Sequence, residues 1–595
     1  MENLPYNASE SDTDAQPHAA GPQQGAPHAA DPHGGERATP SRPVLLGLVA
    51  VIALYGVAAV CGYPQAGRDA IVAAAADDHS KTSDHAEHHD DEAADTGDHP
   101  KEDAEHGEED AQTAGHAAPA HADEAAHDVD HDIDHHGHAK LPAPPIWTVI
   151  PFLALLGAIA AFPLIPSIEH WWEHNSSRFM VAAGLGLLTL LYYALLHPHP
   201  VDVHFPAHAV SQPAEGGISW GVAGTILSNA ILGEYVPFIM LLFALYCVAG
   251  GVRIEGDLAA TPRTNATFIT IGGLLASFIG TTGAAMLLIR PLLETNRQRR
   301  HVVHTVVFFI FVVCNCGGCL LPIGDPPLFL GYLQGVDFFW TLSLWKEWAV
   351  ANVILIAIYL AWDTVMAYPR ERSSDVAIDE ARTRPLQIRG LWPNAPLLLA
   401  VIAAVALLDP SKAIPGTDWH PWVFLREAVL AAIVSLSLAL GSEKIRHDNK
   451  FTYGAILEVA ALFVGIFVCM QPALAILDER GASLGITSPI AFFWTTGLLS
   501  SVLDNAPTYL VFFKTAQTLP GGPEMMAGVE VSRLAAVSLG AVFLGAMTYI
   551  GNGPNFMVKA IAEKAGVRMP SFFGYLAYSG GVLMPVFLLV AYLFL

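Results

Sequence analysis

The chain of 595 residues is 52% hydrophobic, has a mean hydropathy of +0.40 and carries a formal charge of −26. Soluble domains rarely reach such a mean, because apolar runs long enough to cross a membrane belong in lipid. The negative charge is local, since 21 Asp and Glu residues against three Lys lie between Asp77 and Lys140. An acidic excess confined to one segment argues against nucleic-acid binding by the chain as a whole.

The N-terminal part contains one apolar run inside polar sequence. Residues 1–43 are rich in Pro, Ala, Gly and polar side chains and are expected to be disordered. Val44–Cys61 (residues 44–61) follows Arg37 and Arg42, and is either the apolar region of a signal peptide or an anchoring span. Its length and its long leader favour an uncleaved span.

Residues 64–140 form a low-complexity linker that holds 13 of the 26 histidines. Imidazole and carboxylate groups together suit divalent metals such as zinc. The candidate metal ligands are His85, His88, His89, His131, His135 and His136. A solvated acidic tether is the favoured alternative, because low-complexity spacing imposes no coordination geometry.

Residues 146–595 are a succession of apolar runs and are expected to form the transporter domain of an all-α polytopic membrane protein. Two further apolar stretches, Thr267–Leu293 and Thr487–Ala516, contain Gly or Pro near their centres. The expected spans are Ile146–Pro166, Phe179–Leu196, Tyr235–Val252, Val302–Leu333, Trp345–Met366, Leu391–Asp409, Trp422–Leu440, Gly454–Pro472, Ser532–Glu563 and Phe573–Leu595. With the N-terminal run they give about 11 transmembrane helices.

Loop charge predicts how the two interrupted stretches run. Arg253 and Arg263 precede the first stretch, and Arg297, Arg299 and Arg300 follow it. If cytoplasmic loops carry the positive excess, both ends lie inside and this stretch is a re-entrant hairpin. The later basic loops then stay in the cytoplasm, the His-rich loop lies outside, and the second stretch enters from the outer side. The two hairpins are therefore expected to have opposite orientations.

Each hairpin is followed by a helix that Gly and Pro interrupt. Pro322-Ile-Gly-Asp-Pro-Pro and Tyr549-Ile-Gly-Asn-Gly-Pro align without a gap. A hairpin and a broken helix, present twice in opposite orientations, are typical of an inverted-repeat transporter. The first repeat is expected at about 235–366 and the second at about 454–595. Such breaks persist in a membrane only where they line a polar cavity, because unpaired backbone groups are costly in hydrocarbon.

Asp325 and Asp504 are the leading candidates for an ion or substrate site, because each lies in an apolar stretch beside a helix break. Burial disfavours the charged form of a carboxyl group, so protons compete with metal ions for it. A carboxylate that binds either H⁺ or Na⁺, but not both, is the minimal chemistry of antiport. The structural alternative is an ion pair, for which Lys514 or Arg290 is a possible partner.

Neutral oxygens beside the breaks are candidate ligands for a hard cation, although each can instead hold two helices together. They belong to Asn315, Asn505, Asn552, Asn555, Thr281, Thr282 and Thr508. Glu458 and Arg290 are possible pathway residues. Cys314, Cys316 and Cys319 allow a soft-metal site, but the neighbouring glycines favour close helix packing. The six cysteines lie in apolar segments and do not indicate a disulfide framework.

Asn315-Cys-Gly-Gly-Cys-Leu-Leu-Pro-Ile-Gly-Asp325 resembles the Asn-x-Gly-Gly-x-x-x-Pro-Ile-Gly-Asp stretch of NhaD-type sodium/proton antiporters. Asp504-Asn-Ala-Pro507 is similar to an element shared by the wider ion transporter superfamily, which includes citrate and dicarboxylate carriers. The resemblance implies scaffold and transport domains, elevator-like alternating access, a homodimer and a bacterial cytoplasmic membrane. Asp325 departs from the pattern, because Pro326 and Pro327 follow it where those antiporters carry hydroxyl residues.

The leading functional hypothesis is a secondary antiporter that exchanges Na⁺ or Li⁺ for H⁺ without a cofactor. The second is a Na⁺-coupled carrier of citrate or another organic anion, which needs a cationic or donor-rich pocket. The third is a membrane metal sensor that acts through the His-rich loop. An enzyme is disfavoured, because the sequence lacks a nucleophile elbow, a phosphate-binding loop and a zincin helix.

Overall fold

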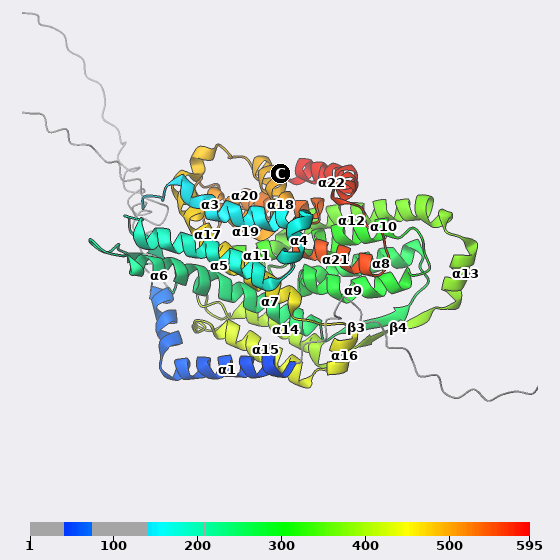
Figure 1. Cartoon of the computed structure of the whole chain (residues 1–595), viewed down its shortest axis with the longest axis horizontal. Coiled ribbons are helices and arrows are strands. Elements are labelled where there is room, and N and C mark those ends of the chain that lie inside the picture. The colour runs from blue at the N-terminus through cyan, green and yellow to red at the C-terminus, as the bar shows by residue number, and fades with distance from the viewer. Residues whose placement is uncertain (1–40, 74–140, 207–208) are drawn as a thin grey trace, which may run out of the picture. The chain divides into compact units, whose positions relative to one another are not determined.

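The computed structural model describes residues 41–73, 141–206 and 209–595 (Figure 1). The expected disordered segment up to residue 40 and the linker over 74–140, with all six candidate histidines, lie outside the described residues. Residues 63–73 are helical, so ordered structure continues past residue 64, where the linker was expected to start.

The N-terminal apolar run forms helix α1 (Ser41–Val60), which contacts α15 (Leu425–Leu440). The Tyr55 hydroxyl donates a hydrogen bond to the Val423 carbonyl at 3.1 Å. The Val423 amide donates to the Pro64 carbonyl at 3.3 Å. Hydrogen bonds and packing therefore tie this helix to a segment more than 350 residues away in sequence.

The first half of the remaining chain is mainly helical. A π-helical segment, η3, interrupts the helix formed by α6 and α7. The elements are η1 (Ile146–Val149), α3 (Ile150–Ala161), η2 (Phe162–Leu164), α4 (Pro166–Trp172), α5 (Asn175–Leu195), α6 (Trp220–Ser228), η3 (Asn229–Tyr235), α7 (Val236–Ala249), α8 (Pro262–Ile279), α9 (Thr281–Thr295), α10 (Val303–Val313), η4 (Cys316–Cys319), α11 (Pro326–Leu333), η5 (Trp340–Leu344) and α12 (Trp345–Trp362).

The second half continues in the same manner. Its elements are η6 (Asp363–Ala367), η7 (Tyr368–Arg370), α13 (Ser373–Ala381), α14 (Leu391–Leu407), α16 (Glu443–Asp448), α17 (Gly454–Arg480), η8 (Gly481–Leu484), α18 (Pro489–Val502), α19 (Asn505–Gln517), α20 (Val531–Leu544), η9 (Gly545–Met547), α21 (Gly553–Lys564) and α22 (Phe572–Phe594). Short antiparallel ribbons pair β1 (Val201–Val203) with β2 (Ala209–Ser211), β3 (Arg253–Asp257) with β4 (Arg384–Arg389), and β5 (Met525–Met526) with β6 (Val529–Glu530).

Six helices among the described residues are long and apolar enough to cross a membrane, or seven if one bent pair counts as a span. Four shorter apolar helices accompany them, including parts of the expected spans over 302–333 and 532–563. The span expected from Tyr235 starts instead at Trp220, because the π-helical segment continues the helix through the polar Asn229 and Glu234. The span expected to end at Pro472 continues to Arg480, with the proline inside the helix.

Local sequence explains where the two central helix pairs start. Helix α8 follows Thr261, whose hydroxyl accepts a hydrogen bond from the Thr264 amide at 3.2 Å. Helix α18 follows Ser488, whose hydroxyl accepts from the Ala491 amide at 3.3 Å. A capping hydroxyl followed by proline is a strong helix start signal, because proline has no amide hydrogen to leave unpaired.

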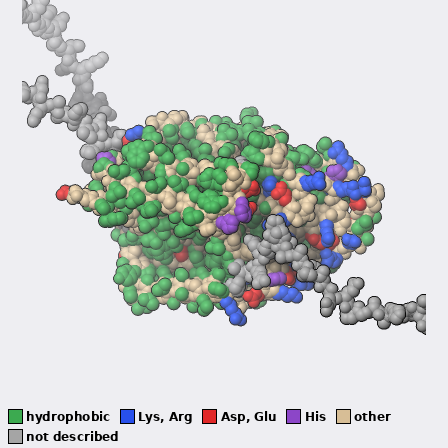
Figure 2. Space-filling model, in the orientation of Figure 1, with side chains coloured by type: hydrophobic (Ala, Val, Ile, Leu, Met, Phe, Trp, Pro, Cys, Tyr) green, Lys and Arg blue, Asp and Glu red, His purple; other side chains and the backbone are tan. Residues whose placement is uncertain are grey.

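One large cluster of buried apolar side chains runs through these helices and includes Phe308, Phe329, Phe467 and Tyr509. Figure 2 shows hydrophobic side chains over much of the visible face, while Lys and Arg gather on the part that carries α13 and β4. The basic side chains there include Arg300, Arg372, Arg382, Arg384 and Arg389. On the visible face, most basic side chains therefore lie toward one end of the helices.

Candidate functional site

The first helix break lies between α10 and α11. The chain leaves α10 at Cys314, makes the short turn η4 and reaches Asp325, which precedes α11. A Cβ atom on Gly324 would collide with the Gly318 carbonyl oxygen, so only glycine allows this close return of the backbone. Pro326 and Pro327 then start α11 without leaving amide hydrogens unpaired.

The second break, between α20 and α21, has a closely similar backbone. Asn552 precedes α21 with φ −152° and ψ 136°, and Asp325 precedes α11 with φ −140° and ψ 142°. A Cβ atom on Gly551 would come within 2.6 Å of the Gly545 carbonyl oxygen. Gly545 and Gly551 therefore take the places of Gly318 and Gly324, at the same spacing before the residue that precedes the helix.

The tips of two helix pairs approach these breaks. Helices α8 and α9 contact each other and join at Gly280, whose φ of +78° is rarely adopted by other residues. Helices α18 and α19 also contact each other and join at Leu503 and Asp504. The Thr281 amide donates to the Gly324 carbonyl at 2.8 Å, so the first tip is attached directly to the first break.

The Asp325 carboxylate lies where all four segments meet and is only 1% exposed. Its Oδ1 accepts hydrogen bonds from the Thr281 hydroxyl at 2.9 Å and from the Asn552 amide at 3.1 Å. Its Oδ2 accepts from the Asn505 amide at 2.8 Å. We call these four residues the carboxylate cage. One side chain from each helix-pair tip and one from the second break thus hold the carboxylate of the first break.

Two more asparagines extend the cage into a network. Asn315 Nδ2 donates to Asn555 Oδ1 at 2.8 Å, and Asn552 Nδ2 also contacts Asn315 Oδ1 at 3.3 Å. Asn555 Nδ2 donates to the carbonyls of Gly545 and Thr548 at 2.9 and 3.0 Å. Asn505 Oδ1 is buried beside this network without a hydrogen-bond partner. An unpaired buried carbonyl oxygen is costly unless it has a ligand to bind.

Asp504 occupies a different position from Asp325. It is partly buried and precedes α19, where its Oδ1 accepts a hydrogen bond from the Ala506 amide at 3.3 Å. The Thr508 hydroxyl donates to the Asp504 carbonyl at 2.9 Å, and Thr282 is partly buried next to Thr281. The Asp504 side chain therefore caps a helix, and of the two acids only Asp325 receives hydrogen bonds from the cage.

The possible ion-pair partners lie elsewhere. Lys514 is 3.6 Å from Asp478, and within the described ranges Asp325 and Asp504 have no ion pair. Glu458 pairs with Arg178 at 3.0 Å, which gives it a structural partner outside the cage. Arg290 lies along α9, and its buried Nε has no hydrogen-bond partner. Within the same ranges no three or more His, Cys, Asp or Glu side chains, the clustered cysteines included, are grouped to hold a metal.

Two polar clusters lie outside the candidate residues predicted from the sequence. Glu234 lies in η3 and accepts a 3.4 Å hydrogen bond from Gln471. The signal was present, since a carboxylate inside an apolar helix is itself a functional indicator. It was missed because the expected span started one residue later, at Tyr235. The second cluster surrounds Arg299, which was assigned only to a basic loop.

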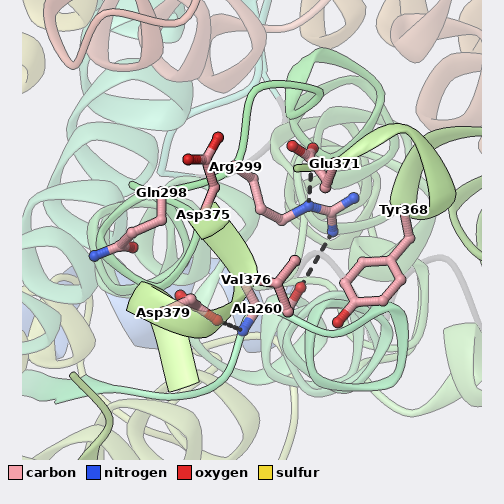
Figure 3. Close-up of a pocket in the computed structure, with 8 residues that line it drawn as sticks. All are labelled: Ala260, Gln298, Arg299, Tyr368, Glu371, Asp375, Val376 and Asp379. Carbon is pink, nitrogen blue, oxygen red and sulfur yellow. Dashed lines mark hydrogen bonds and ion pairs between the residues drawn. The ribbon is translucent and has the colours of Figure 1, made fainter. Parts of the chain in front are cut away.

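Figure 3 shows the surroundings of Arg299, in a small pocket at the end of α9 away from the cage. Its guanidinium contacts Asp363 as well as the Glu371 carboxylate at 3.5 Å. Burial acts to raise the pKa of Glu371, but the amides of Arg300 and His301 donate to its carboxylate and hold the pKa below its ordinary value. This cluster is a satisfied ion network that fastens the loop after α9 to the segment before α13.

Comparisons with known proteins agree with this architecture. Residues 141–595 match the protein family described as "Putative citrate transport". The chain is also 22% identical over 424 residues to proteins described as uncharacterized transporters of Mycobacterium bovis and Mycobacterium tuberculosis. Each match covers 65% of this chain and 88% of the relative. The chain therefore belongs to the "Putative citrate transport" family, and it is a multi-pass membrane protein and a secondary transporter rather than an enzyme.

Proposed function

We propose that this chain exchanges Na⁺ or Li⁺ for H⁺, with the Asp325 cage as the cation site. The observation that carries the proposal is a buried carboxylate held by three neutral donors, without a cationic partner among the described residues. A fixed negative charge in a membrane protein is expensive and is retained mainly where it binds a transported ion.

The oxygen atoms at the cage support a cation rather than a second anion as its ligand. The N-terminal ends of α9, α11, α19 and α21 meet there, and helix N-termini attract negative charge. Asp325 already supplies that negative charge from within the chain. A cation bound beside this carboxylate would have the unpaired Asn505 Oδ1 and the Asn315 Oδ1 as neutral oxygen ligands.

We further propose that the chain has about 11 transmembrane helices, the N-terminal run included, and that residues 235–366 and 454–595 form two inverted repeats with oppositely oriented re-entrant hairpins, α8–α9 and α18–α19. Contacts between equivalent elements support this, since α11 contacts α19 while α21 contacts α9. Basic residues near α13 and β4 support a cytoplasmic location for that end (Figure 2). On this reading, alternating access moves the hairpins and broken helices together as a transport domain, in a homodimer.

A second candidate is Na⁺-coupled transport of citrate or a related anion, which the family description favours. A tricarboxylate beside Asp325 would meet like charge unless cations intervene. Arg290, whose Nε lacks a partner, is the cationic side chain nearest in sequence to the first tip. The citrate hypothesis therefore predicts that Arg290 is essential, whereas cation exchange at the cage does not.

Everted membrane vesicles from cells without their own antiporters test the proposal. A pH-sensitive dye reports the proton gradient after addition of Na⁺, Li⁺, K⁺ or citrate to wild type, Asp325→Asn and Arg290→Gln. Collapse of the gradient by Na⁺ or Li⁺, lost only in Asp325→Asn, is the expected result. No response to any cation, together with Na⁺-dependent citrate uptake that needs Arg290, would replace exchange by anion symport.

A further inference from the structure

Glu234 is a second carboxylate within a membrane-spanning helix, and neither the cage nor the comparisons give it a role. It lies in the π-helical segment η3, near the middle of the 30-residue apolar helix Trp220–Ala249. Segments of π-helix inside α-helices are rare and occur frequently at functional sites. A charged residue at this depth carries a cost that a purely structural helix would avoid.

The surroundings of Glu234 connect three helices. Gln471 on α17 donates from Nε2 to Glu234 Oε2 at 3.4 Å and to the Phe467 carbonyl at 3.2 Å. Lys514 on α19 acts electrostatically on Glu234 and lies 3.6 Å from Asp478 on α17. Glu234 therefore interacts electrostatically with the Lys514 ammonium group on α19, whose ion pair is with Asp478.

Asp325 and Glu234 differ in their hydrogen bonds. Asp325 accepts three bonds of 2.8 to 3.1 Å, and donors of this kind stabilise an ionised carboxylate. Glu234 accepts one long amide contact in an apolar helix. A charged carboxyl with so little compensation is costly, and binding a proton removes that charge. The cage thus suits a metal cation, whereas Glu234 suits a proton.

Other titratable groups on the elements packed against η3 do not compensate Glu234. The segment packs mainly against α6, α7 and α17, and α6 carries no titratable side chain. Cys247 on α7 and Cys469 on α17 are buried among apolar residues. The remaining groups contact atoms elsewhere: Tyr235 donates to the Ala460 carbonyl, Tyr246 to the Thr452 carbonyl, Glu458 pairs with Arg178, and Glu479 pairs with Arg480 at the far end of α17.

We propose that Glu234 binds the transported proton while the Asp325 cage binds the metal cation. This inference depends on the cation exchange proposed above. Helix α19 links the two sites, because it carries Asn505 at its first residue and Lys514 nine residues later. Protonation of Glu234 removes the negative charge that attracts Lys514 and so changes the forces on the helix that holds the cage. Proton binding and cation release are coupled through that helix.

Two measurements on the full-length protein in liposomes test whether Glu234 binds the proton and the Asp325 cage binds the metal cation. Counterflow of radioactive Na⁺ at equal pH reports cation binding and movement, and a pH dye reports Na⁺-driven proton movement. In Glu234→Gln we expect proton movement to fall at least about tenfold while Na⁺ counterflow stays within about twofold of wild type. Glu479→Gln is the control, because it removes another acid from α17 at the far end of that helix, and it should keep both readouts.

The wild-type protein separates the proposed cation exchange from the proposed role of Glu234. If Na⁺ drives no proton movement in the wild type, the exchange itself is refuted. With an active wild type, retention of proton movement in Glu234→Gln would overturn the role of Glu234, as would an equal loss of both readouts. If Glu234→Gln does not fold, Lys514→Gln serves as the test. Removing the positive charge should move the half-maximal pH of exchange upward, and an unchanged midpoint would overturn the inference.

Discussion

The two helix breaks share a backbone and differ in chemistry. Both return through a pair of close-packed glycines and both deliver a polar side chain just before a new helix. The first break presents the carboxylate of Asp325, and the second presents the neutral amide of Asn552. Because the two side chains hydrogen-bond each other at 3.1 Å, the breaks form one site with one fixed charge. Repetition of the backbone thus supplies a scaffold, and asymmetry of its side chains leaves one carboxylate between the two breaks.

The strongest test of this asymmetry moves the charge between the breaks. Asp325→Asn should lower Na⁺-driven proton movement at least about 100-fold, because loss of a buried charged partner typically costs about 3 kcal/mol or more. The exchanged variant, Asp325→Asn with Asn552→Asp, restores one carboxylate within the same cage and should recover part of the activity. Vesicle assays at equal expression check both. An exchanged variant no better than Asp325→Asn would show that position, and not only charge, decides function.

Much of this architecture was predictable from sequence, because helix breaks have strong local signals. Glycine and proline fixed the positions of the breaks, and the capping hydroxyls before Pro262 and Pro489 mark the starts of the helix pairs. Candidate ligands Thr281, Asn505 and Asn552 were identified because each lies next to such a break. Sequence spacing alone did not separate the position of Asp325 from that of Asp504, since one side chain enters the cage and the other caps α19.

Other features depend on tertiary structure and left little local signal. The π-helical turn at Glu234 was missed because the expected apolar span began one residue after it, at Tyr235. The pairing of Arg178 with Glu458 joins helices almost 300 residues apart, which no local pattern predicts. The Arg299 cluster likewise combines the loop after α9 with residues 363–379. The sequence therefore predicts helix breaks and helix caps better than it predicts ion-pair partners that are distant along the chain.

Alanine substitutions in the two glycine pairs test whether the backbones of the two helix breaks are equally constrained. Gly324→Ala and Gly551→Ala each place a methyl group against a backbone carbonyl, which typically costs about 1–3 kcal/mol of stability in close-packed regions. Thermal unfolding of the detergent-purified protein should show a clear decrease for both. Gly553→Ala is the control, because nothing lies within 4 Å of its added Cβ atom. A stable Gly551→Ala variant would mean that the second break relaxes more easily than the first.

Substitutions of the amide donors test how much the second helix-pair tip and the second break each contribute to holding Asp325. Asn505→Ala and Asn552→Ala each remove one hydrogen bond to a charged group, with an expected loss of about 1.5–3 kcal/mol. The apparent Na⁺ affinity should fall about tenfold or more in each variant, whereas Thr282→Ala should change it little. Dye response measured against Na⁺ concentration checks this. If only Asn505→Ala weakens affinity, the cage depends mainly on the helix-pair tip.

Asp504 provides the smallest and most discriminating effect, because its carboxylate caps α19 instead of holding Asp325. Asparagine is as good a capping residue as aspartate, so Asp504→Asn should retain most of the transport activity, while Asp504→Ala should lose about 1 kcal/mol of helix stability. Transport and thermal unfolding measured on both variants distinguish capping from ion binding. Complete loss of transport in Asp504→Asn, with unchanged unfolding, would show that a second fixed charge beside the cage is required. The tip of the second helix pair would then bring its own carboxylate to the transported ion, and the site would contain two acids rather than one.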